Sequence, residues 1–245
     1  MKKIYFVKEI ISGKMVEVVK SYTKGMAKNP ERGGRNKRTS EEQQKENERN
    51  ATKELARKLA CNFKDGDLWT TLTYRPKARP SPEKAKKELM RFIRRTGYRF
   101  KKAGYEFKWV AVTEYENKAI HHHIVMNNPD GLNVAKIIFE QWKQNGIAHH
   151  KPLYSNGDYR ALAEYMVKET SKTFRIRDGG HRQRWSCSRN LTKPTVRYRL
   201  VKKAKKWSPN PKAKKGYRID TDSIVNGVNK WTGKEYQSYT MVRLE

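Results

Sequence analysis

Cysteine is scarce in this sequence, and its two cysteines form no recognisable pair. Cys61 and Cys187 are the only ones among 245 residues, which leaves no Cys-x-x-Cys spacing for a zinc ribbon or finger. Apolar runs are also short, so no segment approaches the length of a membrane span, and residues 1–14 lack the cleavage pattern of a signal peptide. We therefore expect a soluble, cytoplasmic protein that does not associate with membranes.

Acidic residues are few relative to basic ones. The sequence has 56 Lys and Arg against 25 Asp and Glu, which gives a formal net charge of +31. Because neutralising phosphates releases condensed counterions, nucleic acid is the expected partner of such a chain. Attraction to acidic lipid or to ribosomal RNA is the alternative that charge alone leaves open.

Hydrophobic periodicity predicts a compact middle of alternating strands and helices between polar ends. Residues 1–20 alternate weakly and predict a short hairpin, whereas residues 24–40, rich in Gly, Asn, Pro and Arg, predict a basic loop. Strands are expected at residues 67–74, 106–114, 119–127 and 147–153, and helices at residues 40–60, 82–102, 132–144 and 158–171.

The composition changes after the last of these helices. Residues 172–218 hold seventeen Lys and Arg and one acid, Asp178, with five aromatic side chains between them. Since cations contact phosphates while bases stack on aromatic rings, this pattern is typical of a surface for single-stranded nucleic acid. A solvated tail whose aromatic side chains pack on the core is the alternative. The residues expected to contact DNA are Lys172, Arg175, Trp185, Arg189 and Arg197.

Three consecutive histidines lie on one of the predicted strands. Side chains alternate between the faces of a strand, so His121 and His123 point the same way and His122 points the other way. If this strand forms a hairpin with the one before it, Glu114 lies opposite a position near His121. One carboxylate and two imidazoles form a mixed site that accepts Mg²⁺ or Mn²⁺ when phosphate oxygens complete the coordination shell.

Other interpretations of the histidines stay open at this point. They can be surface residues at a DNA interface, and zinc competes for such a site, although the lack of cysteine ligands argues against a structural zinc. His149 and His150 lie on the next predicted strand, where alternation lets at most one of them join the site. Surface or DNA-contact roles are expected for both.

The predicted helix at residues 158–171 places Tyr165 away from its apolar face. At about 100° per residue, Ala163 and Met166 fall on one side, and Tyr165 and Lys168 fall on the other. A free tyrosine titrates at about 10 and is a poor nucleophile at neutral pH. A lysine at i+3 favours the phenolate and neutralises an attacked phosphate. The alternative is an exposed tyrosine packed on a lysine stem. No second tyrosine lies one turn away, so a single nucleophile is indicated.

Taken together, these motifs resemble those of the HUH endonucleases of rolling-circle replication. The likeness is closest to the phage and plasmid replication-associated proteins of the gene II/ORF2 type and runs from about Glu46 to Thr195. His122 departs from the family, which prefers a hydrophobic residue there, and leaves His121 and His122 as rival first ligands, of which alternation favours His121. The motifs that carry the likeness are, in order, Thr71-Leu72-Thr73-Tyr74, Glu114, His121-x-His123, Tyr165-x-x-Lys168 and Ser188-Arg189-Asn190-Leu191-x-x-Pro194.

The resemblance implies a replication initiator that nicks and rejoins one strand of origin DNA, single-stranded or extruded as a hairpin. Tyr165 would form a 5′-phosphotyrosine link and free a 3′-OH that primes synthesis, with Lys168 assisting. Glu114, His121 and His123 would hold Mg²⁺ or Mn²⁺. No Gly-x-x-x-x-Gly-Lys-Ser/Thr motif is present, so a monomeric initiator would rely on a separate helicase and on the polymerase of its bacterial host.

The resemblance also implies an α+β fold, in which a central antiparallel sheet carries the histidine strand and helices pack on it, as in RNA-recognition (ferredoxin-like) folds. The expected domains are an N-terminal hairpin, loop and helix at residues 1–60, the endonuclease core at 61–175 and a basic DNA-binding extension at 176–245. An HUH transposase or relaxase is the rival within the same chemistry. A non-catalytic, basic nucleic-acid-binding protein is the rival from another class.

Overall fold

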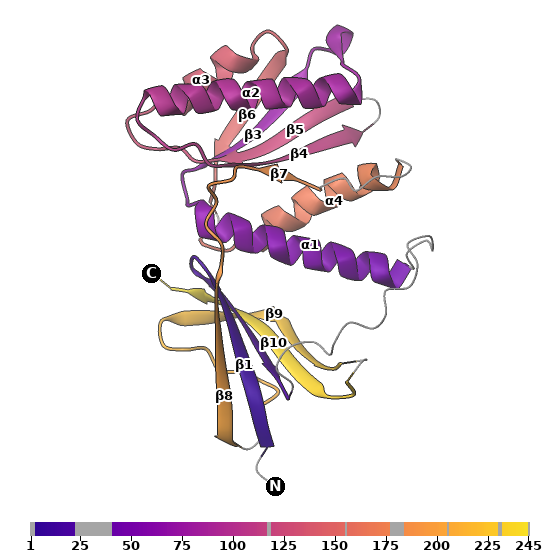
Figure 1. Cartoon of the computed structure of the whole chain (residues 1–245), viewed down its shortest axis with the longest axis vertical. Helices are drawn as coiled ribbons and strands as arrows, with labels where there is room; N and C mark the ends of the chain where they lie inside the picture. Colours follow the sequence, from indigo (N-terminus) through magenta and orange to yellow (C-terminus); the bar gives the residue numbers. More distant parts are fainter. Residues whose placement is uncertain are drawn as a thin grey trace. The chain divides into compact units, whose positions relative to one another are not determined.

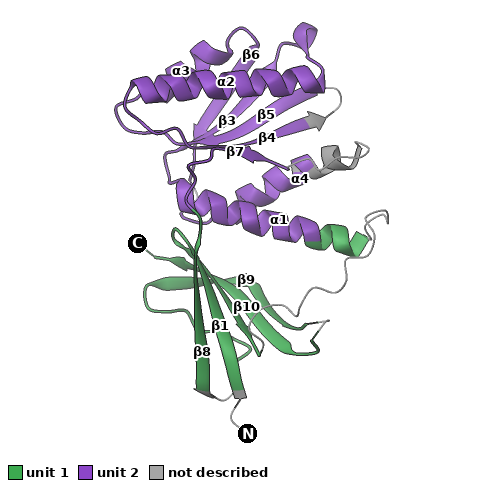
Figure 2. Ribbon diagram, in the orientation of Figure 1, with its two compact units in different colours: residues 1–46, 193–245 green, residues 47–192 purple. Residues whose placement is uncertain are grey.

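The chain forms two compact units, each built on its own antiparallel sheet. One unit comprises residues 47–192, and the other combines residues 1–46 with residues 193–245. The α+β fold class expected from the sequence is confirmed. The expected basic loop at residues 24–40 lies outside the described residues. The computed structural model (Figure 1; units in Figure 2) describes residues 3–22, 41–116, 119–154, 156–176, 184–204, 206–229 and 232–244.

The sheet of residues 47–192 has the strand order β6-β3-β5-β4-β7, so the histidine strand β5 is central. β3, β4 and β5 lie close to their predicted ranges because each carries several buried apolar residues. β6 also lies close to its predicted range, although none of its residues is buried. Gly146 begins β6 where a Cβ atom would lie only 1.9 Å from the carbonyl oxygen of Thr73; hence only glycine fits there. The strands are β3 (Leu68–Tyr74), β4 (Trp109–Glu116), β5 (Ala119–Met126), β6 (Gly146–Pro152) and β7 (Ser186–Cys187).

Helices cover both faces of this sheet. Figure 1 shows α2 and α3 on one face, and α4 and α1 on the other. Ser81 caps α2 by accepting a hydrogen bond from the backbone N–H of Lys84 at 3.4 Å, and Pro82 follows at the first helical position, where its missing N–H costs nothing. The helices are α1 (Glu41–Asn62), α2 (Pro82–Lys102), α3 (Val134–Trp142) and α4 (Arg160–Ile176).

A hydrophobic core fills the space between the sheet and the α2–α3 layer. Phe92 and Phe100, on the apolar stripe of α2, belong to the same buried cluster as Leu72 of β3 and Ile124 of β5. Trp142, at the end of α3, is fully buried and donates its indole N–H to the carbonyl oxygen of Thr73 at 2.9 Å. This packing supports β3 and β5 from behind and leaves their other face for functional side chains.

The second unit joins both ends of the chain in one five-stranded sheet of order β8-β1-β2-β10-β9. Its core includes Trp207, whose ring meets Tyr5 edge-on at 5.1 Å between centroids and stacks on Tyr22 at 4.8 Å. Met241 lies in the same core and is fully buried. The strands are β1 (Lys3–Ser12), β2 (Met15–Ser21), β8 (Thr195–Ala204), β9 (Tyr217–Val228) and β10 (Glu235–Arg243).

The boundaries of the two units differ from the expected domains at residues 1–60, 61–175 and 176–245. The observed boundaries fall near residues 46 and 192, and the hairpin and the basic extension belong to the same unit. The physical reason is the pairing of β1 with β8 and of β2 with β10, for example Val7 with Arg199 and Val18 with Tyr239. No helix in the described ranges is long and apolar enough to cross a membrane.

Met241→Ala tests the second unit. Removing this buried side chain from the interior strand β10 is expected to lower the free energy of unfolding of this unit by about 2–5 kcal/mol, because it leaves a cavity. Hydrogen–deuterium exchange of β1 and β2 peptides measures the loss. Val228→Ala, at a side chain that is 58% exposed, is the control and should cost less than about 1 kcal/mol. Equal effects of the two substitutions would contradict the described core.

Candidate active site

The strand register around β5 decides which side chains meet on the face that α4 covers. β3 and β4 flank β5, and the register aligns Thr71 and Val112 with His123, and Glu114 with His121. Residues paired across antiparallel strands point to the same face. Hence Thr71, Glu114, His121 and His123 share one face of the sheet.

His123 and Glu114 form the centre of this face. Nε2 of His123 lies 3.0 Å from Oε2 of Glu114, a diagonal contact across β4 and β5, and both side chains are about nine-tenths buried. Nδ1 of His123 lies 3.1 Å from the Thr71 hydroxyl. In the neutral tautomer that this network favours, Nε2–H donates to the carboxylate and Nδ1 accepts from the hydroxyl. Both ring nitrogens are therefore held, and the orientation of the imidazole is fixed.

His122 lies on the opposite face, within the core under α3. Its Nε2 is 2.9 Å from the Tyr74 hydroxyl and its Nδ1 is 2.9 Å from the Thr113 hydroxyl, and the side chain is fully buried. Burial lowers the pKa of His122 to about 3, with smaller contributions from His123 and His121. His122 is therefore a neutral core residue whose ring is directed away from Glu114.

Tyr165 reaches the same face from α4. Its ring lies edge-on to His123, with 5.6 Å between the ring centroids, and the side chain is 44% exposed. The helix buries Ala163, Met166 and Val167, which anchors it to the sheet. Tyr165 therefore lies at the margin of the packed face, in contact with the histidine and accessible to solvent.

Trp69 completes the contact between the strand and the helix. Its ring stacks on His123 at 5.1 Å with an interplanar angle of 10° and meets Tyr165 edge-on at 6.0 Å. Trp69 is not among the residues that the sequence motifs predict. The signal was present, because alternation along β3 puts Trp69 on the same face as Thr71, but a contact with a distant helix cannot be read from a strand pattern.

Lys168 is exposed on α4, three residues after Tyr165. Its charge forms no ion pair with any side chain that the structure describes, so it remains available to an anion. His121 is partly buried and aligned with Glu114, and His149 and His150 are exposed on the edge strand β6. The pairing of Thr71 with both His149 and His123 puts His149, but not His150, on the active-site face.

The residues expected to bind DNA are distributed over both units. Trp185 and Arg189 lie beside β7, the first partly buried and the second exposed, whereas Arg197 is exposed on β8 of the other unit. The side chains of Lys172 and Arg175 lie outside the described part of the structure. The segment that begins with Ser188 is held against the sheet, since the Ser188 hydroxyl accepts from the Trp109 N–H at 3.2 Å.

A metal ion would find only part of a coordination shell in this arrangement. Among the residues that the structure describes, no group of three His, Cys, Asp or Glu side chains is already placed to hold one. His123 and Glu114 bond to each other through the atoms that would face a cation. Their donor types, an imidazole nitrogen and a carboxylate oxygen, nevertheless suit Mg²⁺ or Mn²⁺ completed by phosphate oxygens.

Comparison with known proteins agrees with the family that the order of the motifs indicated. The model of the family of replication-associated proteins of the ORF2/gene II type matches residues 67–174, from the start of β3 to near the end of α4. The matched segment is thus similar to this replication-associated family, as its motifs indicated, and it contains Glu114, His121, His122, His123 and Tyr165. No curated protein and no solved structure is significantly similar to the chain.

His122→Gln tests the two-faced histidine strand. The folded protein keeps His122 neutral down to a pKa of about 3, whereas the unfolded chain protonates it near 6.5. The free energy of unfolding of the wild type should therefore decrease as the pH is lowered through this interval, by up to about 1.4 kcal/mol per pH unit. In His122→Gln this contribution to the slope is removed.

Urea denaturation at several pH values measures the slope, and His150→Gln, at an exposed histidine of β6, is the control. The control should keep the slope of the wild type. The same slope in His122→Gln as in the wild type would show that His122 is not held neutral in the core.

Proposed function

We propose that this protein nicks and rejoins one strand of origin DNA in rolling-circle replication, with Tyr165 as the single nucleophile. The observation that carries the proposal is the contact of Tyr165 with His123, 5.6 Å between ring centroids, beside the Glu114 carboxylate. The family match supports a role in replication. An exposed tyrosine next to a buried imidazole–carboxylate pair is suited to phosphodiester chemistry rather than to structural packing.

The proposed reaction is a transesterification at phosphorus. The phenolic oxygen of Tyr165 forms a bond to the phosphorus, and the bond from phosphorus to the 3′ oxygen breaks. The leaving oxygen takes the bonding electron pair, and the proton lost by the phenol balances the proton gained by the 3′ hydroxyl. The products are a 5′-phosphotyrosine and a free 3′-OH. Attack by a 3′-OH on the phosphotyrosine reverses the step and rejoins the strand.

Residues around Tyr165 supply charge and position. Lys168, one turn along α4, is suited to stabilise the phenolate and the phosphate that it attacks. Thr71 bonds to Nδ1 of His123, and Trp69 covers the face of its ring. Partners of this kind orient a ligand or a base and are needed for its precision. His123 and Glu114 are almost fully buried, so water screens the charge of this pair only weakly.

Glu114, His121 and His123 are the proposed donors for Mg²⁺ or Mn²⁺. When bound, the cation would polarise the scissile phosphate and hold it for in-line attack. The hydrogen bond between Glu114 and His123 keeps two of these donors 3.0 Å apart on one face. The proposed substrate is single-stranded or hairpin origin DNA, and strand separation and synthesis are assigned to a separate helicase and to the host polymerase.

Tyr165→Phe tests the nucleophile. Labelled oligonucleotides that tile both strands of the cognate replicon are incubated with the protein and Mn²⁺, and covalent adducts are resolved on a denaturing gel. The wild type should form an adduct with one strand, and Tyr165→Phe should form none, because the phenylalanine lacks the attacking oxygen. Tyr154→Phe, at a highly exposed tyrosine, should keep the adduct. An adduct of equal yield in Tyr165→Phe would overturn the assignment.

Glu114→Gln tests the metal donors. The amide keeps the shape of the side chain but removes its charge, so the Mn²⁺ concentration that gives half-maximal adduct should rise by about 10- to 100-fold. Glu140→Gln is the matched control, because Glu140 lies on α3, on the other side of the sheet. This substitution should leave the half-maximal Mn²⁺ concentration unchanged. A metal requirement that is the same in Glu114→Gln and the wild type would exclude this carboxylate as a donor.

A further inference from the structure

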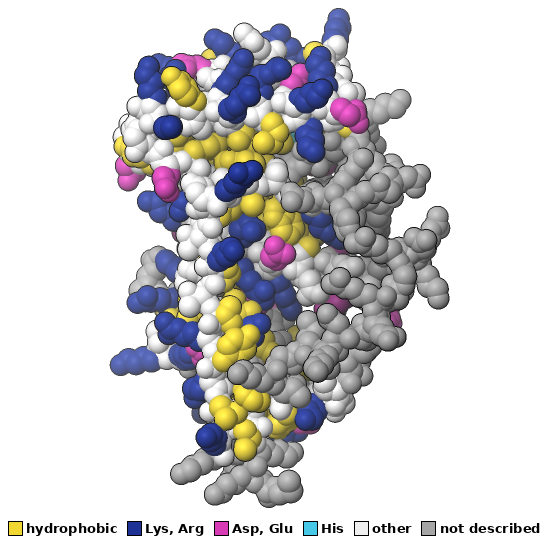
Figure 3. Space-filling model, viewed as in Figure 1, with side chains coloured by type: hydrophobic (Ala, Val, Ile, Leu, Met, Phe, Trp, Pro, Cys, Tyr) yellow, Lys and Arg dark blue, Asp and Glu magenta, His cyan; other side chains and the backbone are white. Residues whose placement is uncertain are grey.

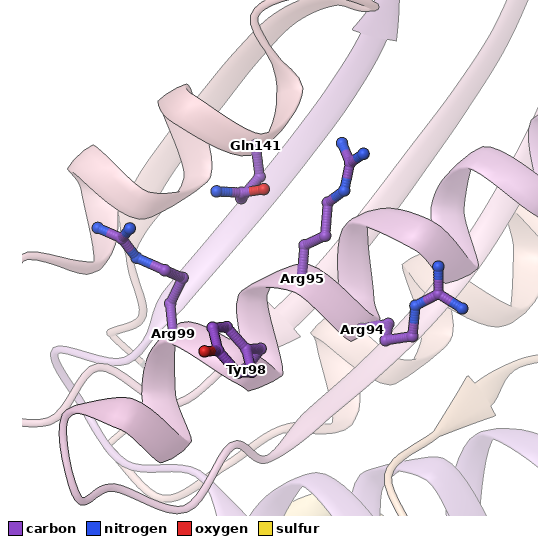
Figure 4. Close-up of a pocket in the computed structure, with 5 residues that line it drawn as sticks. All are labelled: Arg94, Arg95, Tyr98, Arg99 and Gln141. Carbon is purple, nitrogen blue, oxygen red and sulfur yellow. The ribbon is translucent and has the colours of Figure 1, made fainter.

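A cationic depression lies on the opposite face of the same unit, between α2 and α3. Figure 4 shows Arg94, Arg95, Tyr98 and Arg99 on α2 and Gln141 on α3 around it. Its volume of about 430 Å³ leaves room for a nucleotide-sized group. Since α4 covers the other face of the sheet (Figure 1), this depression is separate from the candidate active site.

The helix α2 carries far more basic than acidic side chains. Its sequence contains nine Lys and Arg and only two Glu, and Figure 3 shows basic side chains gathered over this helix. In contrast, the sequence of α1 has five acids and five bases. Arg91, Arg95 and Arg99 follow one another at i, i+4 spacing, where like charges repel and destabilise a helix. A helix that needed only solubility would mix both signs, so the arrangement favours an anionic ligand.

Two of the arginines are available to such a ligand. Arg99 lies 3.4 Å from the carboxylate of Glu140. Arg94 and Arg95 are exposed, and neither forms a hydrogen bond or an ion pair with any residue in the described ranges. A guanidinium presents paired N–H donors in a planar fork that matches the oxygens of a phosphate. The depression therefore offers two free phosphate-binding groups, from consecutive positions of α2.

Tyr98 adds a surface for a base. Its side chain is 67% exposed and lines the depression together with the arginines. Bases stack on exposed aromatic rings without regard to their sequence, while neighbouring cations hold the backbone. Arginine alone would suit any polyanion, whereas an exposed ring between arginines favours an unpaired nucleotide.

We propose that the depression lined by Arg94, Arg95, Tyr98 and Arg99 binds a second segment of single-stranded DNA. Phosphates lie on the arginines and one base stacks on Tyr98. The site goes beyond the proposed nicking function, because binding here uses neither Tyr165 nor a metal ion. A strand held at this face would remain attached to the protein while another part of it reacts, which raises its effective concentration at the opposite face.

The test is equilibrium binding of the full chain to fluorescein-labelled oligo(dT) in EDTA, followed by anisotropy over a range of salt concentrations. The double variant Arg94→Glu/Arg95→Glu should bind roughly tenfold more weakly. The slope of log K against log salt should be lower by about 1.4, since each phosphate contact with a single strand contributes about 0.7. Tyr98→Ala should weaken binding at every salt concentration without changing the slope. Tyr98→Phe should keep the affinity of the wild type, because it keeps the aromatic ring.

Lys86→Glu/Lys87→Glu is the matched control, because it makes the same change of charge at exposed positions of the same helix outside the depression. If both double variants weaken binding equally, only net charge matters and the proposal is overturned. It is equally overturned if Arg94→Glu/Arg95→Glu keeps its affinity for oligo(dT) but loses affinity for vesicles of anionic lipid. Because EDTA excludes catalysis, these results stand whether or not Tyr165 forms an adduct.

Discussion

The register of β5 between β3 and β4 is the constraint on which the candidate site depends. It sets His123 beside Thr71 and one diagonal step from Glu114, and it sends His122 into the opposite core. A slip of one residue would exchange the two faces. The site would then lose the imidazole that contacts Tyr165, and the core would receive residues without the hydroxyl partners that His122 finds in Tyr74 and Thr113.

The same strand thereby contributes to the core on one face and carries the candidate site on the other. His122, neutral and bonded at both nitrogens, ties β5 to β3 and β4. His123 is oriented by groups from the same two strands and covered by Trp69, and α4 brings Tyr165 against it. The helix can present the proposed nucleophile because its buried side chains fix it on the sheet, while Tyr165 remains accessible.

Most strands and helices of the unit of residues 47–192 could be predicted from the sequence because they are amphipathic. The position of Glu114 relative to His121 could be predicted because both lie in one hairpin, formed by β4 and β5. The strand at residues 119–127 and its hairpin with the preceding strand put Glu114 near His121, as the register then shows. The contact of Tyr165 with Trp69 joins segments almost a hundred residues apart, and no pattern within either segment encodes it. The hydrogen bond between Glu114 and His123, rather than a preformed group of three ligands, was not foreseen either.

The sheet that joins both ends of the chain in the second unit could not be predicted from the sequence, for a different reason. In β8, Val196, Tyr198 and Leu200 alternate with Arg197 and Arg199, but the density of basic residues predicts a basic DNA-binding extension rather than a strand. A strand of this kind becomes recognisable only when it pairs with β1, from the other end of the chain. Non-local pairing is the information that composition and periodicity lack.

The most direct test of the central claim is to identify the amino acid that carries DNA after the reaction. The adduct formed with the cognate strand is digested with nuclease and protease, and the modified peptide is sequenced by mass spectrometry. If Tyr165 is the nucleophile, the nucleotide phosphate will be found on its side chain, within the peptide from α4. A phosphate on any other residue, with Tyr165 unmodified, would contradict it.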